Sequence, residues 1–177
     1  MTTPWRSYRY VGPAELVPAE RSAAGRRIAD AETFDDWASA QTATERVQPF
    51  TFVVDVHGVL CLAPRRSEHV VCAGGGDVLS AGEVTFARVG NRWGAVEVTN
   101  QSTGYCPDVS SWPAVAAALD QVGLDRPPGF THEVVFRRCE ACRRLNIVRE
   151  GDFFCVFCEH VLPQDWNVDV RRQTPRA

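Results

Sequence analysis

The chain has 177 residues, of which 45% are hydrophobic and 23% charged, and its formal net charge is −3; this composition is typical of a folded globular protein and not of a disordered one. A nucleic-acid-binding chain usually carries an excess of Lys and Arg, so the acidic balance disfavours nucleic acid as a partner. No apolar run approaches the roughly 18 residues that span a bilayer, and the first residues lack the apolar segment of a secretory signal, so we expect no membrane partner.

The N-terminal segment, residues 1–32, is rich in Pro, Arg, Ala and Glu. We expect it to form an irregular arm whose early aromatic residues anchor it onto the domain that follows. Thr33 and Asp36 resemble a capping box, although Glu or Gln is the usual partner. A short helix is therefore predicted over roughly residues 34–45, with Phe34 buried.

The middle of the chain is rich in β-branched and aromatic residues. The runs 50–56 and 59–63 flank a His-Gly pair, which is typical of a hairpin with a tight turn. The runs 83–89 and 95–99 flank the segment GNRWG and predict a second hairpin. The sequence therefore indicates a small antiparallel β domain.

A helix is predicted after these hairpins, over residues 110–121. Ser111 is a preferred N-cap residue, Pro113 fits the first turn, and Gly123 marks the helix end. The segment Asp-Arg-Pro-Pro-Gly that follows is the clearest linker signal in the chain, and we place a linker at residues 125–130.

Four cysteines lie in the segment CEACRRLNIVREGDFFCVFC, as two CxxC pairs separated by twelve residues: Cys139, Cys142, Cys155 and Cys158. A CxxC turn directs two thiolates at one ion, and two such turns complete a tetrahedral shell. A closed four-cysteine shell leaves no position for water or substrate, so the pattern predicts a zinc ribbon with structural Zn²⁺. Iron in a rubredoxin-like site uses similar pairs and remains an alternative.

The other three cysteines, Cys61, Cys72 and Cys106, are scattered and odd in number. Together with the metal-ligand spacing of the quartet, this favours a reducing cytoplasm over a secreted disulfide framework. Between residues 132 and 160, five arginines are balanced by five acidic residues. A nucleic-acid footprint needs an excess of basic residues, so the ribbon is expected to be a stabilising module or a protein-docking surface.

The sequence as a whole therefore predicts an α+β protein: a small antiparallel β domain with one or two flanking helices and a C-terminal zinc ribbon. The expected parts are an irregular arm (1–32), the α+β domain (33–124), the linker (125–130), the zinc ribbon (131–166) and a tail (167–177).

Polar residues that could carry chemistry gather in two predicted loops, at residues 66–82 and 100–108. Consecutive glycines allow backbone conformations that other residues avoid and let a ligand approach the main chain. The pattern matches neither the P-loop nor the dinucleotide fingerprint. The candidate ligand-binding residues are His69, Gly74, Gly75, Gly76, Glu83, Ser102, Thr103 and Tyr105.

These motifs resemble a β domain of the plant IQ-motif calmodulin-binding proteins, which also occurs in uncharacterised bacterial proteins. His69 corresponds to the first histidine of that pattern, Gly75 and Gly76 to its glycine pair, and Ala81-Gly82-Glu83 to the opening of a strand. The segment STGYCP at residues 102–107 corresponds to the motif Ser-Gly-His-Tyr-x-Pro. The resemblance covers about residues 50–124 and implies a fold more than an activity.

The chain departs from that family at two points. Thr103 and Gly104 replace the Gly-His pair, so any acid–base or binding role of the second histidine is lost here. The IQ motif is also absent, so calmodulin binding does not carry over.

Three functions are compatible with the sequence. The leading hypothesis is a cytoplasmic zinc-binding protein without catalytic activity, which recognises a protein or a small ligand through the two loops. The second is an enzyme that transfers or hydrolyses a nucleotide-linked or side-chain group, with His69 as general base, Glu83 or Tyr105 as its partner, and Cys106 as a weaker candidate nucleophile. The third is a nucleic-acid-associated zinc ribbon protein. Each loop residue also has a structural interpretation, in which it only stabilises a turn.

Overall fold

The computed structural model describes residues 5–19 and 25–169, which belong to two compact units. The N-terminal unit is Met1–Glu133 and the C-terminal unit is Val134–Ala177. Both contain antiparallel β-structure, and the N-terminal unit also has a few helices, so the protein is α+β. Among the described helices, none combines the length and the apolar character that a bilayer crossing needs.

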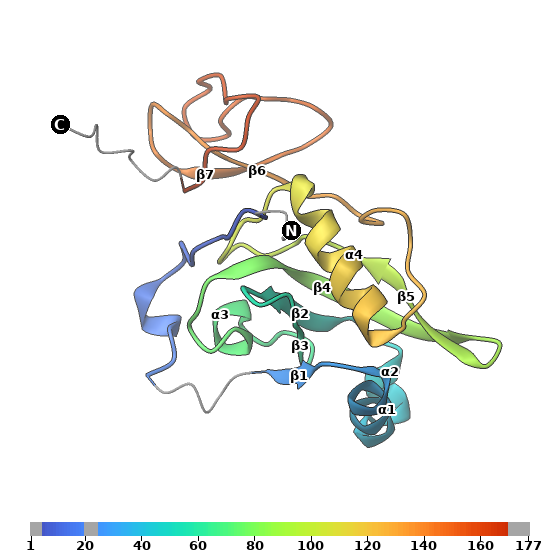
Figure 1. Cartoon of the computed structure of the whole chain (residues 1–177). Helices are drawn as coiled ribbons and strands as arrows, with labels where there is room; N and C mark the ends of the chain where they lie inside the picture. Colours follow the sequence, from blue (N-terminus) through green and yellow to red (C-terminus); the bar gives the residue numbers. More distant parts are fainter. Residues whose placement is uncertain (1–4, 20–24, 170–177) are drawn as a thin grey trace. The chain divides into compact units, whose positions relative to one another are not determined.

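The N-terminal unit is built on a five-stranded antiparallel sheet with the order β1-β3-β2-β4-β5 (Figure 1). Its strands are β1 (Arg26–Ile28), β2 (Phe50–Asp55), β3 (Leu60–Ala63), β4 (Val78–Val89) and β5 (Arg92–Val98). The β2–β3 and β4–β5 hairpins confirm the two predicted hairpins. In the first turn, Asp55 accepts hydrogen bonds from the backbone NH groups of His57 (2.9 Å) and Val59 (3.0 Å), so its side chain closes the hairpin.

The predicted helix at 34–45 is instead two helices, α1 (Ala31–Ala40) and α2 (Ala43–Arg46). The prediction of Thr33 as the N-cap was wrong, because Asp30 caps α1 and Thr33 is its capping-box partner. A second capping box, formed by Thr42 and Glu45, starts α2. The first NH groups of a helix have no partner within that helix, and here a capping box supplies partners at the start of α1 and again at the start of α2. The second capping box therefore explains why a new helix begins after Ala40.

The other helices are the short α3 (His69–Cys72) and α4 (Trp112–Val122), with 3₁₀ turns η1 (Ala14–Leu16) and η3 (Val109–Ser111). The helix α4 ends at Gly123, whose φ of 80° is left-handed, as the sequence predicted. Ser111 precedes α4 but makes no capping hydrogen bond. Its hydroxyl lies 2.9 Å from that of Ser80 instead, which satisfies two buried hydroxyl groups.

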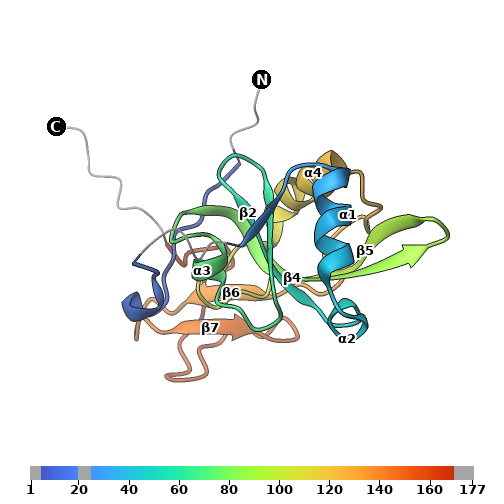
Figure 2. The same ribbon diagram turned by 90° about the horizontal axis from the view of Figure 1, so that it is seen from below.

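The main hydrophobic core lies on one face of the sheet, which α1 and α4 cover (Figures 1 and 2). Phe52 and Val54 of β2 and Phe34 of α1 are buried in it. Because side chains alternate along a strand, Val53 and Cys61 face the other side of the sheet. There Cys61 lies near Cys72 of α3, and burial together with this neighbour raises the pKa of Cys72 to about 12.

Segments far apart in the sequence complete the sheet. Tyr8, which is fully buried, exchanges backbone hydrogen bonds with Val78 (2.7 and 3.0 Å). Strand β1 pairs with β3, so the segment expected to be irregular supplies an edge strand. Residues 125–133 belong to the N-terminal unit: Phe130 is buried in its core, and the Thr131 NH donates to the Val98 carbonyl (2.8 Å).

The described part of the C-terminal unit contains a two-stranded antiparallel sheet of β6 (Val135–Arg138) and β7 (Leu145–Val148). Arg137 is 7% exposed, and its guanidinium donates to the carbonyls of Phe136 (2.8 Å), Pro163 (3.1 Å) and Gln164 (2.6 Å). The buried Arg137 side chain thus holds residues 163–164 against β6.

Candidate functional site

The four-cysteine cluster lies in the C-terminal unit, and its sulfur atoms all lie within 4.8 Å of one another. The Sγ atoms of Cys139 and Cys158 are 3.6 Å apart, as are those of Cys142 and Cys155. Four sulfurs that share a tetrahedral ion with bonds of about 2.3 Å would be about 3.8 Å apart. The cluster therefore matches the size of a metal shell, and the predicted ligand set is brought together.

Two CxxC turns of the same local structure build the cluster. In the first, the Cys139 NH donates to the Arg144 carbonyl and the Arg143 NH donates to the Cys139 carbonyl, both at 2.9 Å. The second repeats this pattern four and five residues after Cys155, with both bonds at 2.8 Å. The fourth residue after the leading cysteine has a left-handed φ in both turns, 66° at Arg143 and 60° at Glu159. Each CxxC pair thus lies in a turn that is closed by backbone hydrogen bonds between its own residues.

Hydrogen bonds to sulfur orient the ligands. The Cys142 NH lies 3.5 Å from the Cys139 Sγ, and the side-chain amide of the buried Asn146 donates to the Cys155 Sγ at the same distance. The Asn146 carbonyl oxygen accepts from the Val156 NH (3.0 Å). Because this amide connects β7 to the second turn, it fixes the ligand geometry in the way that outer partners do at metal sites.

The thiols compete for ionisation. The backbone NH of Cys142 lowers the pKa of Cys139. Burial opposes ionisation of Cys155, but two following NH groups lower its pKa to about 6. The His160 NH favours a thiolate at Cys158, yet desolvation and the three neighbouring sulfurs raise its pKa to about 12. Four thiolates this close need a cation between them, which is the chemistry of a divalent metal site.

His69, at the start of α3, is partly buried, and its Nε2 lies 2.9 Å from the Gly82 carbonyl. A carbonyl can only accept, so Nε2 carries the proton. Burial lowers the pKa of His69, opposed by this hydrogen bond and by the negative charges of Glu83 and Glu68. The ring is thus held neutral as a bridge between α3 and β4.

This position predicts a pH-dependent stability of the N-terminal unit. The pKa of His69 is about 6.5 when unfolded and lower when folded, so the unfolded chain binds more protons between these values. The contribution of His69 should be full above about pH 6.5 and lost as the pH falls through the folded pKa. Denaturant unfolding across this range should show the loss.

His69→Gln keeps an NH donor for Gly82 without a titrating group, so its unfolding free energy should vary less with pH than that of the wild type. His57→Gln, at an exposed turn, is the matched control and should behave as the wild type. Equal pH profiles for wild type and His69→Gln would contradict this role of His69.

Tyr105 is fully buried, and its hydroxyl donates to the Gly76 carbonyl (2.6 Å). Burial, with the nearby charge of Asp77, raises the pKa of Tyr105 well above its usual range. Its ring packs edge-on against Tyr10, with centroids 5.6 Å apart. Tyr105 is therefore a neutral donor that ties the loop at 100–108 to the glycine turn.

The glycine run ends α3. The Gly74 NH donates to the Val71 carbonyl (2.9 Å) and the Gly75 NH to the Val70 carbonyl (2.8 Å). Gly74 and Gly75 have φ values of 61° and 79°, which favour glycine. The glycines thus form the turn that follows α3, and the Gly76 carbonyl in this turn accepts the hydrogen bond of the Tyr105 hydroxyl.

The remaining loop residues take part in local hydrogen bonds. The Ser102 hydroxyl accepts from the Tyr105 NH (3.3 Å), and the Cys106 thiol, which is buried, donates to the Thr103 carbonyl (3.3 Å). The Glu83 NH donates to the Thr99 hydroxyl (3.3 Å). Thr103 is exposed, whereas Ser102 is 1% exposed.

The structure brings some of the predicted loop residues together and keeps others apart. The charge of Glu83 acts on His69, while Tyr105 and Ser102 contact each other. His69 binds the Gly82 carbonyl, the Tyr105 hydroxyl binds the Gly76 carbonyl, and the Cys106 thiol binds the Thr103 carbonyl. The observed contacts all stabilise loop conformation, so the geometry supports the structural interpretation of these residues.

Sequence reasoning missed Asn146 and an apolar surface on the second CxxC turn. Of the large exposed hydrophobic side chains in the described residues, four lie within residues 154–161: Phe154 (54% exposed), Val156 (75%), Phe157 (53%) and Val161 (58%). The signal was present, because Val156 and Phe157 occupy the two variable positions of that CxxC pair. We call these four residues the apolar surface.

Comparisons of the chain with protein-family models, with curated proteins and with solved structures found no match. Function therefore has to be inferred from the residues themselves. Across residues 5–19 and 25–169, the four-cysteine cluster is the one group of three or more His, Cys, Asp or Glu side chains close enough to hold a metal ion. The site that this structure defines is thus a candidate metal centre made of four cysteine sulfurs.

Proposed function

We propose that this protein is a cytoplasmic zinc-binding interaction module, in which structural Zn²⁺ folds the C-terminal unit into a zinc ribbon that docks onto another protein. The observation that carries the proposal is the apolar surface on a metal-binding turn. Four thiolates in a closed shell suit Zn²⁺ and leave no position for a substrate. All seven cysteines are described and none forms a disulfide, which supports a reducing compartment.

The apolar surface is suited to protein contact. Exposed hydrophobic side chains are normally scattered singly, and a contiguous group indicates an interaction site. Phe154 and Val161 form an antiparallel bridge, which places them side by side. The Arg144 guanidinium lies 4.6 Å from the ring centroid of Phe157, so a cation borders the apolar group. Aromatic residues and arginine are both enriched at protein–protein interfaces.

Nucleic acid is the less suitable partner. The phosphate backbone is recognised through an excess of Lys and Arg, whereas arginines and acidic residues are balanced across residues 132–160. Large exposed valine and phenylalanine side chains gain little from phosphate contacts. The proposed partner is therefore a protein with an apolar groove or patch.

The double variant Phe154→Ser/Phe157→Ser is expected to lose the partner. Both side chains are more than half exposed, so their replacement should change stability by less than about 0.5 kcal/mol and leave zinc content unchanged. Val47→Ser/Val89→Ser is the matched control, because these valines are 75% and 67% exposed in the N-terminal unit. Affinity capture with quantitative mass spectrometry compares the three proteins.

The expected result is a protein that the wild type and the control capture and that is depleted at least about tenfold with Phe154→Ser/Phe157→Ser, which we call the ribbon variant. If the captured protein is the chain itself, size-exclusion chromatography should show a self-association that the ribbon variant lacks. Identical captures by all three proteins would refute the docking role and leave the zinc proposal standing.

A further inference from the structure

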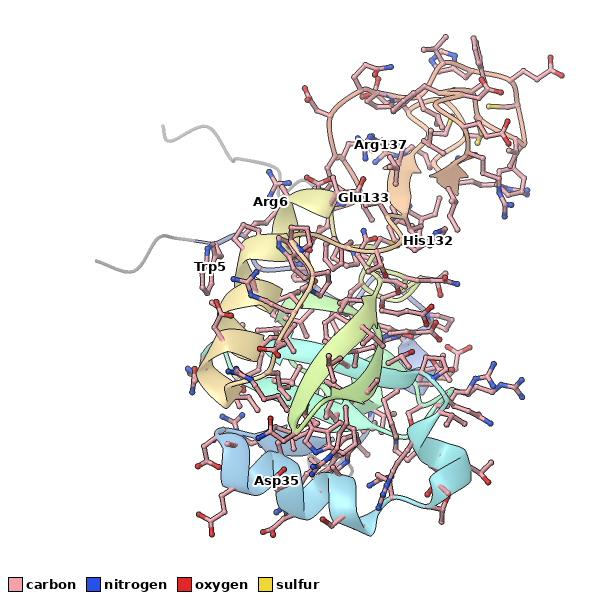
Figure 3. All side chains as sticks on the ribbon, turned by 90° about the vertical axis from the view of Figure 1, so that its right-hand side faces the viewer. Trp5, Arg6, Asp35, His132, Glu133 and Arg137 are labelled. Atoms are coloured by element: carbon pink, nitrogen blue, oxygen red, sulfur yellow. The ribbon has the colours of Figure 1, made fainter. Side chains whose placement is uncertain are left out.

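A groove in the N-terminal unit lies between α1 and the β4–β5 hairpin. It consists of two adjoining hollows of about 170 and 450 Å³, which share Asp35, Arg88 and Trp93 in their walls. Asp35 is seen on α1 beside the end of this hairpin in Figure 3. The volume of the larger hollow falls within the range of small-molecule sites, which is typically about 300–1,000 Å³. We call it the arginine groove.

Three arginines and one carboxylate line the arginine groove. Arg46, at the end of α2, lines the larger hollow, Arg92 the smaller, and Arg88 both, opposite Asp35. The chain as a whole is acidic, with a formal net charge of −3. The groove is therefore a local concentration of positive charge on an acidic protein, which attracts small anions.

Arg88 is positioned for recognition. Its guanidinium carbon lies 5.0 Å from the ring centroid of Trp93. Trp93 packs in turn against the core, with its ring centroid 5.8 Å from that of Phe34. Among the described residues, Arg88 has no carboxylate within ion-pair distance. A guanidinium stacked on a fixed ring keeps its in-plane NH donors for a ligand and loses little entropy on binding.

The other two arginines are held loosely. Arg92 pairs with Asp125 at 2.9 Å, but both side chains are more than half exposed, so the pair is weak and can rearrange. A guanidinium nitrogen of Arg46 donates to the Ser39 carbonyl (3.3 Å). Both retain further NH donors, because an arginine carries five.

The chemistry of the lining selects the ligand class. A phosphomonoester carries about −1.5 to −2 charges and three acceptor oxygens at neutral pH, so it can engage several guanidinium groups at once. Asp35, Ser39 and Asn91 offer acceptors for ligand hydroxyls. A long polyanion suits the groove less, because α1 carries three acidic residues, of which Asp35 lines the groove.

We propose that the arginine groove binds a small phosphorylated molecule that bears hydroxyl groups. Arg88 holds the phosphate, Arg46 and Arg92 add charge from either side, and Asp35 accepts from a hydroxyl. This site lies within the N-terminal unit and does not depend on the metal centre or on the apolar surface.

Isothermal titration calorimetry of the full-length, zinc-loaded protein tests the site with four probes: ribose 5-phosphate, inorganic phosphate, ribose and succinate. Wild type should bind ribose 5-phosphate saturably, inorganic phosphate more weakly, and ribose and succinate at least about tenfold more weakly than the sugar phosphate. No saturable binding of either phosphate probe would overturn the proposal. Succinate binding as tight as that of ribose 5-phosphate would also overturn it, because the groove would then select carboxylates.

Arg88→Gln should weaken ribose 5-phosphate binding about tenfold, and Arg88→Lys, which keeps the charge but not the planar fork, by less. Arg26→Gln is the matched control: this exposed arginine lies on β1, at the opposite edge of the sheet from β5, and its loss should change the affinity less than twofold. Thermal unfolding of each variant verifies folding. Equal affinities for wild type and Arg88→Gln would refute the site.

Discussion

Removal of the metal from the purified protein is expected to unfold the C-terminal unit and to leave the N-terminal unit folded. The core of the C-terminal unit consists largely of the cluster itself: Cys139, Cys155 and Leu162 are buried, with Cys142, Val148 and Phe153 packed against them. A two-stranded sheet of four-residue strands is marginal by itself in water. Zinc contributes about 10–16 kcal/mol in zinc-finger domains of similar size, so we expect metal binding to supply most of the folding free energy of this unit.

Hydrogen exchange with mass spectrometry separates the two units. The purified protein should contain about one zinc per chain, and chelation should remove the protection of β6 and β7 while β2 and β4 stay protected. Cys142→Ser should have the same effect without a chelator. Cys61→Ala is the control, because this buried thiol lies in the N-terminal unit and burial raises its pKa to about 11. The zinc content of the Cys61→Ala protein should equal that of the wild type.

A metal-free protein in which β6 and β7 remain protected would contradict the metal-dependent fold. Iron in place of zinc would be recognised by its visible absorption. It would change the identity of the ion but not the expected unfolding, because the four thiolates would still be the core.

Gly82→Ala is expected to be among the most destabilising single substitutions in the N-terminal unit. A Cβ at this position would lie 1.9 Å from the Thr99 carbonyl oxygen and 2.8 Å from its carbon. Both are backbone atoms of the chain that leaves β5, so neither can rotate away. The strands must separate locally, which also strains the bond from His69 to the Gly82 carbonyl. We expect a loss of about 3 kcal/mol in the free energy of unfolding.

Gly129→Ala is the matched control, because a Cβ there meets nothing within 4 Å and its φ is not left-handed. That substitution should change stability by less than about 0.5 kcal/mol. Urea unfolding followed by tryptophan fluorescence compares the two variants. If Gly82→Ala unfolds at the same urea concentration as Gly129→Ala, the close approach of Gly82 and Thr99 does not exist in solution.

The features that sequence reasoning predicted are those that short segments determine. The cysteine cluster follows from two six-residue turns, at residues 139–144 and 155–160, and the end of α4 follows from one glycine at φ 80°. The hairpins β2–β3 and β4–β5 join neighbours in the chain, so alternation and turn residues were sufficient to find them.

The features that it missed depend on contacts between distant segments. Nothing in residues 26–28 distinguishes an edge strand from a loop until Leu60–Ala63 lies beside them. The glycine-rich and polar segments around His69 and Tyr105 suggested a ligand site, but whether a histidine binds a carbonyl of its own chain is a question of distance that one sequence does not answer. The arginine groove was missed for the same reason, since α1, α2 and the β4–β5 hairpin contribute separately to it.

The long-range pairing of the first described residues has a consequence for synthesis on the ribosome. Tyr8 pairs with Val78, and the Val11 NH donates to the Gly104 carbonyl (2.7 Å). Residues 8–11 are synthesised before the residues that they pair with, so they are among the last to find their place in the fold. Until then the side of the sheet around Val78 stays open to wrong partners, which is the condition under which nascent chains engage chaperones. The four candidate metal ligands all lie in the C-terminal unit, which is compact by itself, so a shortage of metal in the cell would leave the larger unit able to mature.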